Sequence, residues 1–135
     1  MVRTREELCE RADHLVLCLP STPSTHHFID DAALARMKPG VHLVNVARGA
    51  LVDQQALRAA LDDGRVACAS LDVVEPEPLP QGHWLYAHPR VRLSPHISWS
   101  APQAFAALLA GFLGNVGRFG RGEDLGGVVD REAGY

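Results

Sequence analysis

The sequence lacks the basic excess and the long apolar runs that mark several functional classes. Its 13 lysines and arginines stand against 16 aspartates and glutamates, so the net charge is −3 and no basic stripe is available to a phosphate backbone. No segment approaches the roughly 18 apolar residues of a membrane helix, and no apolar stretch follows the charged N-terminus. We therefore expect no nucleic-acid partner and no membrane insertion.

Paired cysteines and metal-binding histidine spacings are also missing. Cys9, Cys18 and Cys68 are odd in number and have no CxxC spacing, and the last two lie in apolar runs typical of a core. They indicate a reducing, cytoplasmic setting. Six further histidines show no HxxxH or HxH spacing, so we expect no metal site. These are His14, His26, His27, His42, His83 and His88.

What is present is the composition of a folded domain, with 47% apolar and 21% charged residues in a chain of 135. Short apolar runs alternate with helical patterns, which predicts a parallel α/β sheet whose ligands bind beyond the carboxyl ends of the strands. We expect strands at 15–19, 41–47, 66–73 and 91–95, the first of them buried on both faces. Helices are expected from 30 or 31 to 37, from 53 to 63 and from about 100 to 119.

Three residues suited to chemistry follow successive predicted strands. Arg48 ends one run and precedes Gly49, which permits a ligand to approach the backbone closely. Glu77 and His96 follow the next two strands. Each has an ordinary interpretation: a surface arginine paired with Asp53, a solvated acidic loop, and a hydrogen-bonded structural histidine. Their joint placement at one edge of the sheet favours a functional site.

Four ordered motifs resemble the D-isomer-specific 2-hydroxyacid dehydrogenases, which include phosphoglycerate dehydrogenase and the glyoxylate/hydroxypyruvate reductases. The motifs lie at 12–23, 45–53, 71–80 and 88–97, and the resemblance runs from about residue 11 to 135. It implies an incomplete Rossmann-type fold, the second half of a doubly wound NAD-binding domain. Residues 1–120 would form that half, and 121–135 would be a tail that returns to the substrate domain.

The resemblance implies hydride transfer between NAD or NADP and a small 2-hydroxy or 2-keto acid. In this family an arginine holds the substrate, a histidine exchanges the proton and a glutamate pairs with the histidine, roles that would fall to Arg48, His96 and Glu77. The family places its glutamate five residues after an Asp-Val aspartate, here Asp72, and directly before a proline, which selects Glu77 over Glu75. The residues implied on the nicotinamide side of the cofactor are Leu19, Pro20, Val46, Ala47, Arg48, Asp72, His96 and Ser98.

The chain departs from the family pattern in two places. It has no GxGxxG turn, so the first mononucleotide-binding half is expected to be missing and the preference for NAD or NADP is not specified. Ser98-Trp99 replaces the usual glycine pair after the histidine and isoleucine. Without the first half, the strand at 15–19 becomes an apolar edge that favours self-association. The alternative interpretation is therefore a non-catalytic remnant that acts as a self-association or interaction module.

Overall fold

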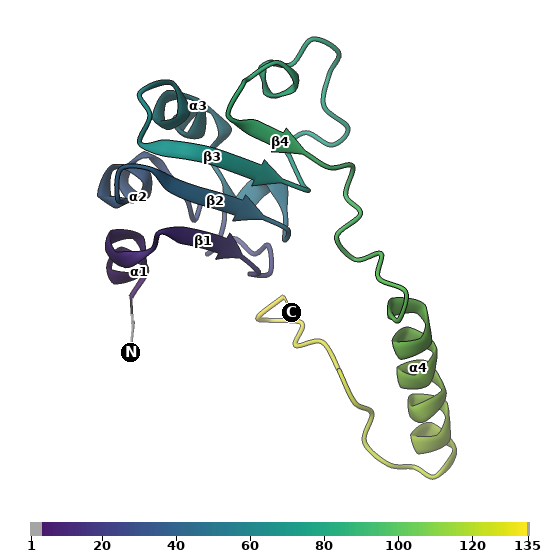
Figure 1. Cartoon of the computed structure of the whole chain (residues 1–135). Helices are drawn as coiled ribbons and strands as arrows, with labels where there is room; N and C mark the ends of the chain where they lie inside the picture. The colour runs from purple at the N-terminus through teal and green to yellow at the C-terminus, as the bar shows by residue number, and fades with distance from the viewer. Residues whose placement is uncertain (1–3, 135) are drawn as a thin grey trace. The chain divides into compact units, whose positions relative to one another are not determined.

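The chain forms two compact units, one up to His96 and one from Ile97 onward. The computed structural model describes residues 4–134, so the start of the charged N-terminus and Tyr135 of the expected tail lie outside the described residues. The first unit is built on a four-stranded sheet (Figure 1). The second contains one long helix, α4 (Ala104–Gly120). No helix within residues 4–134 combines the length and hydropathy that crossing a membrane requires.

The sheet is parallel throughout, which confirms the predicted α/β class. Its strands lie side by side in chain order: β1 (His14–Leu17), β2 (Val41–Asn45), β3 (Val66–Leu71) and β4 (Val91–Leu93). The predicted ends at 19, 47, 73 and 95 each lie two residues beyond the observed ends at 17, 45, 71 and 93. The apolar pattern continues past two of the strands because Ala47 and Val73, beyond the ends of β2 and β3, are also buried.

Three short helices accompany the sheet. α1 (Arg5–Arg11), which the sequence pattern did not predict, begins after Thr4, whose side chain accepts a hydrogen bond from the Glu7 N–H. α2 (Asp31–Arg36) and α3 (Gln54–Asp62) begin after the aspartates expected to cap them. Two 3₁₀ turns, η1 (Gly49–Leu51) and η2 (Trp84–Tyr86), follow β2 and β3. Figure 1 shows α1, α2 and α3 in a row beside the strands.

The helices cover one face of the sheet and leave the other face open. Right-handed crossovers that proceed in one direction along a sheet place their helices on the same face. Leu15, Leu17 and Leu43 are buried on that face, whereas Val16 between them is 53% exposed. The prediction that the first strand is buried on both faces was therefore wrong, because α1, α2 and α3, the helices of the first unit, cover only one face of the sheet.

The burial of the cysteines depends on which face of the sheet is covered. Cys18 is exposed and Cys68 is half-buried, so the expectation that both belong to the core was wrong. Cys9, on α1, is the buried one, and burial raises the pKa of its thiol. All three are free thiols.

Beyond the strand ends, the buried Asn45 ties three loops together. Its amide nitrogen donates to the Arg48 carbonyl oxygen (2.8 Å), and its amide oxygen accepts from the Ala47 N–H (3.1 Å). Its own carbonyl oxygen accepts from the Asp72 N–H (2.9 Å), and the Asp72 carbonyl oxygen accepts from the His96 N–H (2.9 Å). Since Asn45 is 1% exposed, these bonds form away from water and hold the loops in a single arrangement.

Gly49 allows two of these loops to touch. A Cβ atom on Gly49 would overlap the carbonyl group of Val74, so only glycine permits this approach. The sequence interpretation, in which the glycine makes room for a ligand, is thus replaced by one in which it makes room for backbone. The loop that carries Arg48 is packed against the loop that leads to Glu77.

We predict that Asn45→Ala lowers the free energy of unfolding by about 1–3 kcal/mol, because it leaves the buried Ala47 N–H without its partner and removes the shorter of two hydrogen bonds to the Arg48 carbonyl oxygen. Urea denaturation followed by circular dichroism measures the change. Asn115→Ala is the matched control, since Asn115 also makes two side-chain bonds to backbone, both to Gly126, but in an exposed position. Its expected cost is about 0.5 kcal/mol or less. Equal effects of the two variants would contradict the role given to Asn45.

Gly49→Ala is expected to destabilise the chain by about 1–3 kcal/mol, because the added methyl group forces the Val74 backbone away. Gly111→Ala is its control, since a Cβ at Gly111 meets nothing within 4 Å and alanine favours the helix. The same denaturation measurement should show a loss for the first variant and none for the second. A Gly49→Ala chain as stable as the parent would show that the two loops do not need their close contact.

Candidate active site

The residues that follow β2, β3 and β4 gather at the carboxyl edge of the sheet, where parallel α/β proteins bind their ligands. Arg48 follows β2, Asp72 and Glu77 follow β3, and His96 follows β4. The hydrogen bonds from Asn45 through Asp72 to His96 fix the positions of these segments relative to one another along the strand direction. The fold therefore brings together segments that lie far apart in the sequence.

His96 and Glu77 form an exposed pair. The His96 Nδ1 lies 2.9 Å from the Glu77 Oε1, and the two side chains are 38% and 40% exposed. His96 has φ +53, a left-handed conformation that is uncommon outside glycine, although histidine, like asparagine and aspartate, adopts it more often than most residues do. A surface pair of this kind adds little stability, and backbone strain clusters at functional positions. The pair is thus held open to solvent at some conformational cost.

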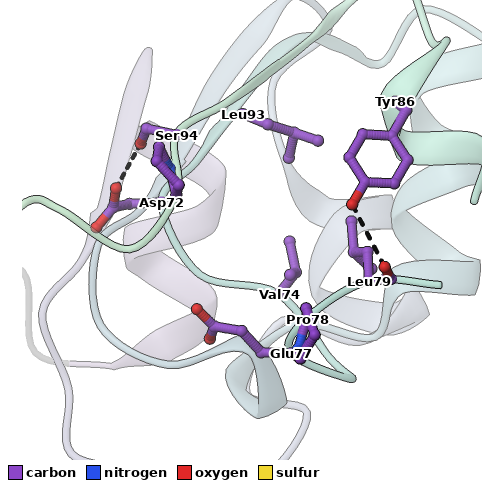
Figure 2. Close-up of a pocket in the computed structure, with 9 residues that line it drawn as sticks. Asp72, Val74, Glu77, Pro78, Leu79, Tyr86, Leu93 and Ser94 are labelled. Carbon is purple, nitrogen blue, oxygen red and sulfur yellow. Dashed lines mark hydrogen bonds between the residues drawn. The ribbon is translucent and has the colours of Figure 1, made fainter. Parts of the chain in front are cut away.

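Asp72, whose carbonyl oxygen accepts a hydrogen bond from the His96 N–H, is 5% exposed. Its carboxylate accepts a hydrogen bond from the Ser94 hydroxyl (Figure 2). Ser94, which the sequence reasoning did not select, is the last residue before the proline that precedes His96. The signal that could have identified it is a hydroxyl next to the strand end, opposite a buried carboxylate on the neighbouring strand.

Arg48 is exposed and starts the 3₁₀ turn η1. Its guanidinium donates to the Ala47 carbonyl oxygen (2.6 Å). The alternative pairing with Asp53 is not the arrangement seen, since Asp53 accepts from the N–H groups of Gln55 and Ala56 at the start of α3. Arg48 therefore has its charged group at the sheet edge. It takes no part in the hydrogen bond between His96 and Glu77.

A cleft of about 400 Å³ opens beside these residues. Figure 2 shows Asp72 and Ser94 on one side and Tyr86 with Leu79 on the other, where the Tyr86 hydroxyl donates to the Leu79 carbonyl oxygen (3.4 Å). The cleft is mostly apolar, with carboxylates of Asp72 and Glu77 at its wall, the pattern typical of small-molecule sites. Its lining residues are Asp72, Val74, Glu77, Pro78, Leu79, Tyr86, Leu93, Ser94 and Pro95.

A smaller hollow of about 150 Å³ shares Asp72, Leu93 and Ser94 with the cleft and reaches the open face of the sheet. Val46, expected on the cofactor side, lines this hollow. Of the other residues in that expected set, Ala47 is buried, and Leu19 and Pro20 are half-buried just beyond β1. Ser98 belongs to the second unit of the chain.

Comparison with known proteins places this arrangement in a family. Residues 1–98 match the family model described as D-isomer specific 2-hydroxyacid dehydrogenase, NAD binding domain. Glyoxylate/hydroxypyruvate reductase A of Serratia proteamaculans is 40% identical over 122 residues, which make up 90% of this chain and 38% of that protein. Glyoxylate/hydroxypyruvate reductase B of Enterobacter agglomerans is 47% identical over 92 residues, 68% of this chain and 28% of that protein.

Solved structures of 2-hydroxyacid dehydrogenases resemble this chain as well. A D-isomer specific 2-hydroxyacid dehydrogenase from Xanthobacter autotrophicus, in complex with NADPH and MES, matches with a TM-score of 0.88 at 38% identity, covering 96% of this chain and 53% of that one. The NADPH-dependent glyoxylate/hydroxypyruvate reductase of Sinorhizobium meliloti, in complex with NADP and sulfate, has a TM-score of 0.88 at 32% identity, covering 97% and 42%. The chain spans less than half the length of the curated relatives above, and it belongs to the D-isomer-specific 2-hydroxyacid dehydrogenase family.

Proposed function

We propose that this chain carries the substrate-side residues of an NAD(P)-dependent oxidoreductase that interconverts a small 2-keto acid and the corresponding D-2-hydroxy acid. The observation that carries the proposal is the His96–Glu77 pair, 2.9 Å apart and open to solvent at the carboxyl edge of a parallel sheet. Membership of the family supports the reaction class. The names of the Serratia and Sinorhizobium relatives support glyoxylate and hydroxypyruvate as the first substrates to test.

Arg48 is proposed to bind the substrate carboxylate. A guanidinium presents parallel N–H donors that match a carboxylate in a bidentate pair, and its exposure leaves it accessible to a small acid. Gly49 and Asn45 hold the loop that carries it, so the arginine starts from a fixed backbone position. Such a pair would orient the 2-keto group toward His96.

His96 is proposed to exchange a proton with the oxygen on C2 of the substrate. Because Nδ1 faces the Glu77 carboxylate, the ring's other nitrogen, Nε2, is the one we assign to this transfer. Glu77 would hold the ring in one orientation through Nδ1 while Nε2 exchanges the proton with the substrate oxygen. General acid catalysis of this kind accelerates reactions by roughly 10²–10⁴-fold.

A nicotinamide cofactor fits the residues present at the sheet edge. The 400 Å³ cleft and the adjoining hollow offer apolar walls to a flat ring, and the buried Asp72 places one polar group among them. NAD or NADP would supply the hydride when bound. We propose the residues that would hold its nicotinamide side to be Leu19, Pro20, Val46, Ala47, Arg48, Asp72, His96 and Ser98, within a half-domain of residues 1–120 followed by a tail.

The proposed roles can be tested in a chimaera in which this chain replaces the matching segment of the Serratia reductase. We expect the chimaera to oxidise NADPH or NADH with glyoxylate or hydroxypyruvate, as followed by absorbance. His96→Gln should lower kcat/KM by about 10²–10⁴-fold because the proton donor is lost. Arg48→Gln should mainly raise KM because the carboxylate loses its bidentate partner.

His88→Gln is the matched control, because His88 also faces a carboxylate, with its Nε2 3.2 Å from the Asp62 Oδ1, but away from the cleft. It should leave kcat/KM unchanged. A folded chimaera without turnover, or a His88→Gln effect as large as that of His96→Gln, would exclude the proposed roles.

A second candidate function, a self-association module, is favoured by the open sheet face and by the edge strand. Among the described strands β1 pairs only with β2, and Val16 is 53% exposed. α4 has no buried residue in the part of the chain that the structure describes, and Phe112 on it is 65% exposed. Apolar surface on this scale marks interaction sites.

If this second function holds, analytical ultracentrifugation should show oligomers whose population rises with concentration. Val16→Lys should shift them toward monomer by placing a charge on the strand that associates. Val129→Lys is its control, since Val129 is similarly exposed (60%) but lies in the tail. A chain that stays monomeric at every concentration while it binds NADPH would count against this function.

A further inference from the structure

His26, His27 and Glu75 form a cluster of potential metal ligands away from the cleft. One ligand atom from each residue lies within 4.8 Å of the others. The histidines belong to the loop after β1 and the glutamate to the loop after β3. The sequence spacing predicts no metal site, because 48 residues separate His27 from Glu75 and only the sheet brings the two loops together.

The backbone of both loops is anchored where the cluster forms. The His27 N–H donates to the Ala50 carbonyl oxygen (2.8 Å), and the His26 N–H donates to the Thr22 carbonyl oxygen (3.1 Å). On the other side, the Gln54 amide nitrogen donates to the Glu75 carbonyl oxygen. The side chains thus project from hydrogen-bonded positions, which reduces the entropy that ion binding would cost.

His27 adopts an unusual conformation at this place. Its φ is +50, a left-handed value that is uncommon outside glycine, although histidine adopts it more often than most residues do. Its ring stacks on that of His26, with centroids 3.9 Å apart and planes inclined by 26°. This backbone conformation therefore puts two imidazoles next to each other.

Two imidazoles and one carboxylate form a donor set for borderline divalent ions. We propose that His26, His27 and Glu75 bind a divalent transition-metal ion such as Zn²⁺ or Co²⁺. Ligands about 2 Å from a tetrahedral ion lie roughly 3.3 Å from one another, so rotation of these partly exposed side chains closes the remaining gap. Three protein ligands leave the fourth position to water.

Two neighbouring groups suit such an ion. The Asp53 Oδ2 lies 3.9 Å from the His27 Nδ1, where a carboxylate can orient a ligand imidazole. The Gln54 Oε1 is buried and accepts no hydrogen bond from any described residue, although it belongs to the amide that holds the Glu75 carbonyl. A water on the ion would supply the missing donor. Buried polar atoms without partners are rare, so this one supports an additional component at the site.

The ion would link two loops of the first unit and would take no part in the proposed hydride transfer. It would join the loop after β1 to the loop after β3, and Glu75 lies two residues before Glu77. Bound metal stabilises the folded chain by mass action, so the melting temperature should rise with ion concentration. The inference is independent of the proposed oxidoreductase function, because neither Arg48 nor His96 belongs to the cluster.

The test is a titration of the chelator-treated chain with Zn²⁺, by calorimetry, and with Co²⁺, by absorption. We expect one ion per chain and a Co²⁺ spectrum of nitrogen and oxygen ligands, without the charge-transfer band of a thiolate. His26→Ala and Glu75→Gln should each weaken binding by more than the roughly 10–100-fold that loss of an outer-shell partner costs. His27→Asn should do the same while it retains the left-handed backbone, so the loss cannot be attributed to unfolding.

His14→Ala is the matched control, since the His14 and His42 Nδ1 atoms lie 3.4 Å apart on the open sheet face and form a second close pair of histidines, on two neighbouring strands. It should leave Zn²⁺ affinity unchanged. The proposal is overturned if the folded chain binds no ion, if binding is lost in His14→Ala and kept in His27→Asn, or if Co²⁺ shows thiolate ligation.

Discussion

The buried amide of Asn45 is the interaction on which the site geometry depends. It satisfies backbone groups of Ala47 and Arg48 at the end of β2, and its own carbonyl begins the series that passes through Asp72 to His96. Asn45 and Asp72 are buried, so an alternative arrangement would leave a buried polar group unsatisfied at a cost of about 1–3 kcal/mol. The loops after three strands therefore behave as one unit, although no regular structure connects them.

Because helices cover only one face of the sheet, side chains on the other face are exposed. All crossovers lie on one face, so Leu15 and Leu17 pack against helices, while Val16 is left exposed on the opposite face. The same alternation exposes Cys18 and leaves Cys68 half-buried. Both candidate functions draw on this arrangement, since the open face adjoins the hollow at Asp72 and also offers apolar surface to another molecule.

The sequence was sufficient for the parallel sheet and for the placement of Arg48, Glu77 and His96 beyond strand ends, because apolar runs and crossover spacing are local signals. It was not sufficient for strand ends, because packed residues such as Val73 continue the apolar pattern after the ladder stops. Contacts between loops could not be predicted from the sequence either. Gly49 against Val74, and His27 beside Glu75, depend on which loops the sheet makes adjacent and how closely.

The candidate site separates the groups that hold position from the groups suited to react. Asn45 and Asp72 are buried and bonded to backbone or to Ser94, so their contribution is rigidity. His96 and Glu77 are partly exposed, and their contact adds little stability in water. The solvent-accessible histidine keeps its left-handed backbone conformation because its N–H is bonded to the carbonyl oxygen of the buried Asp72. The exposed pair is therefore better explained by the chemistry proposed for it than by any contribution to folding.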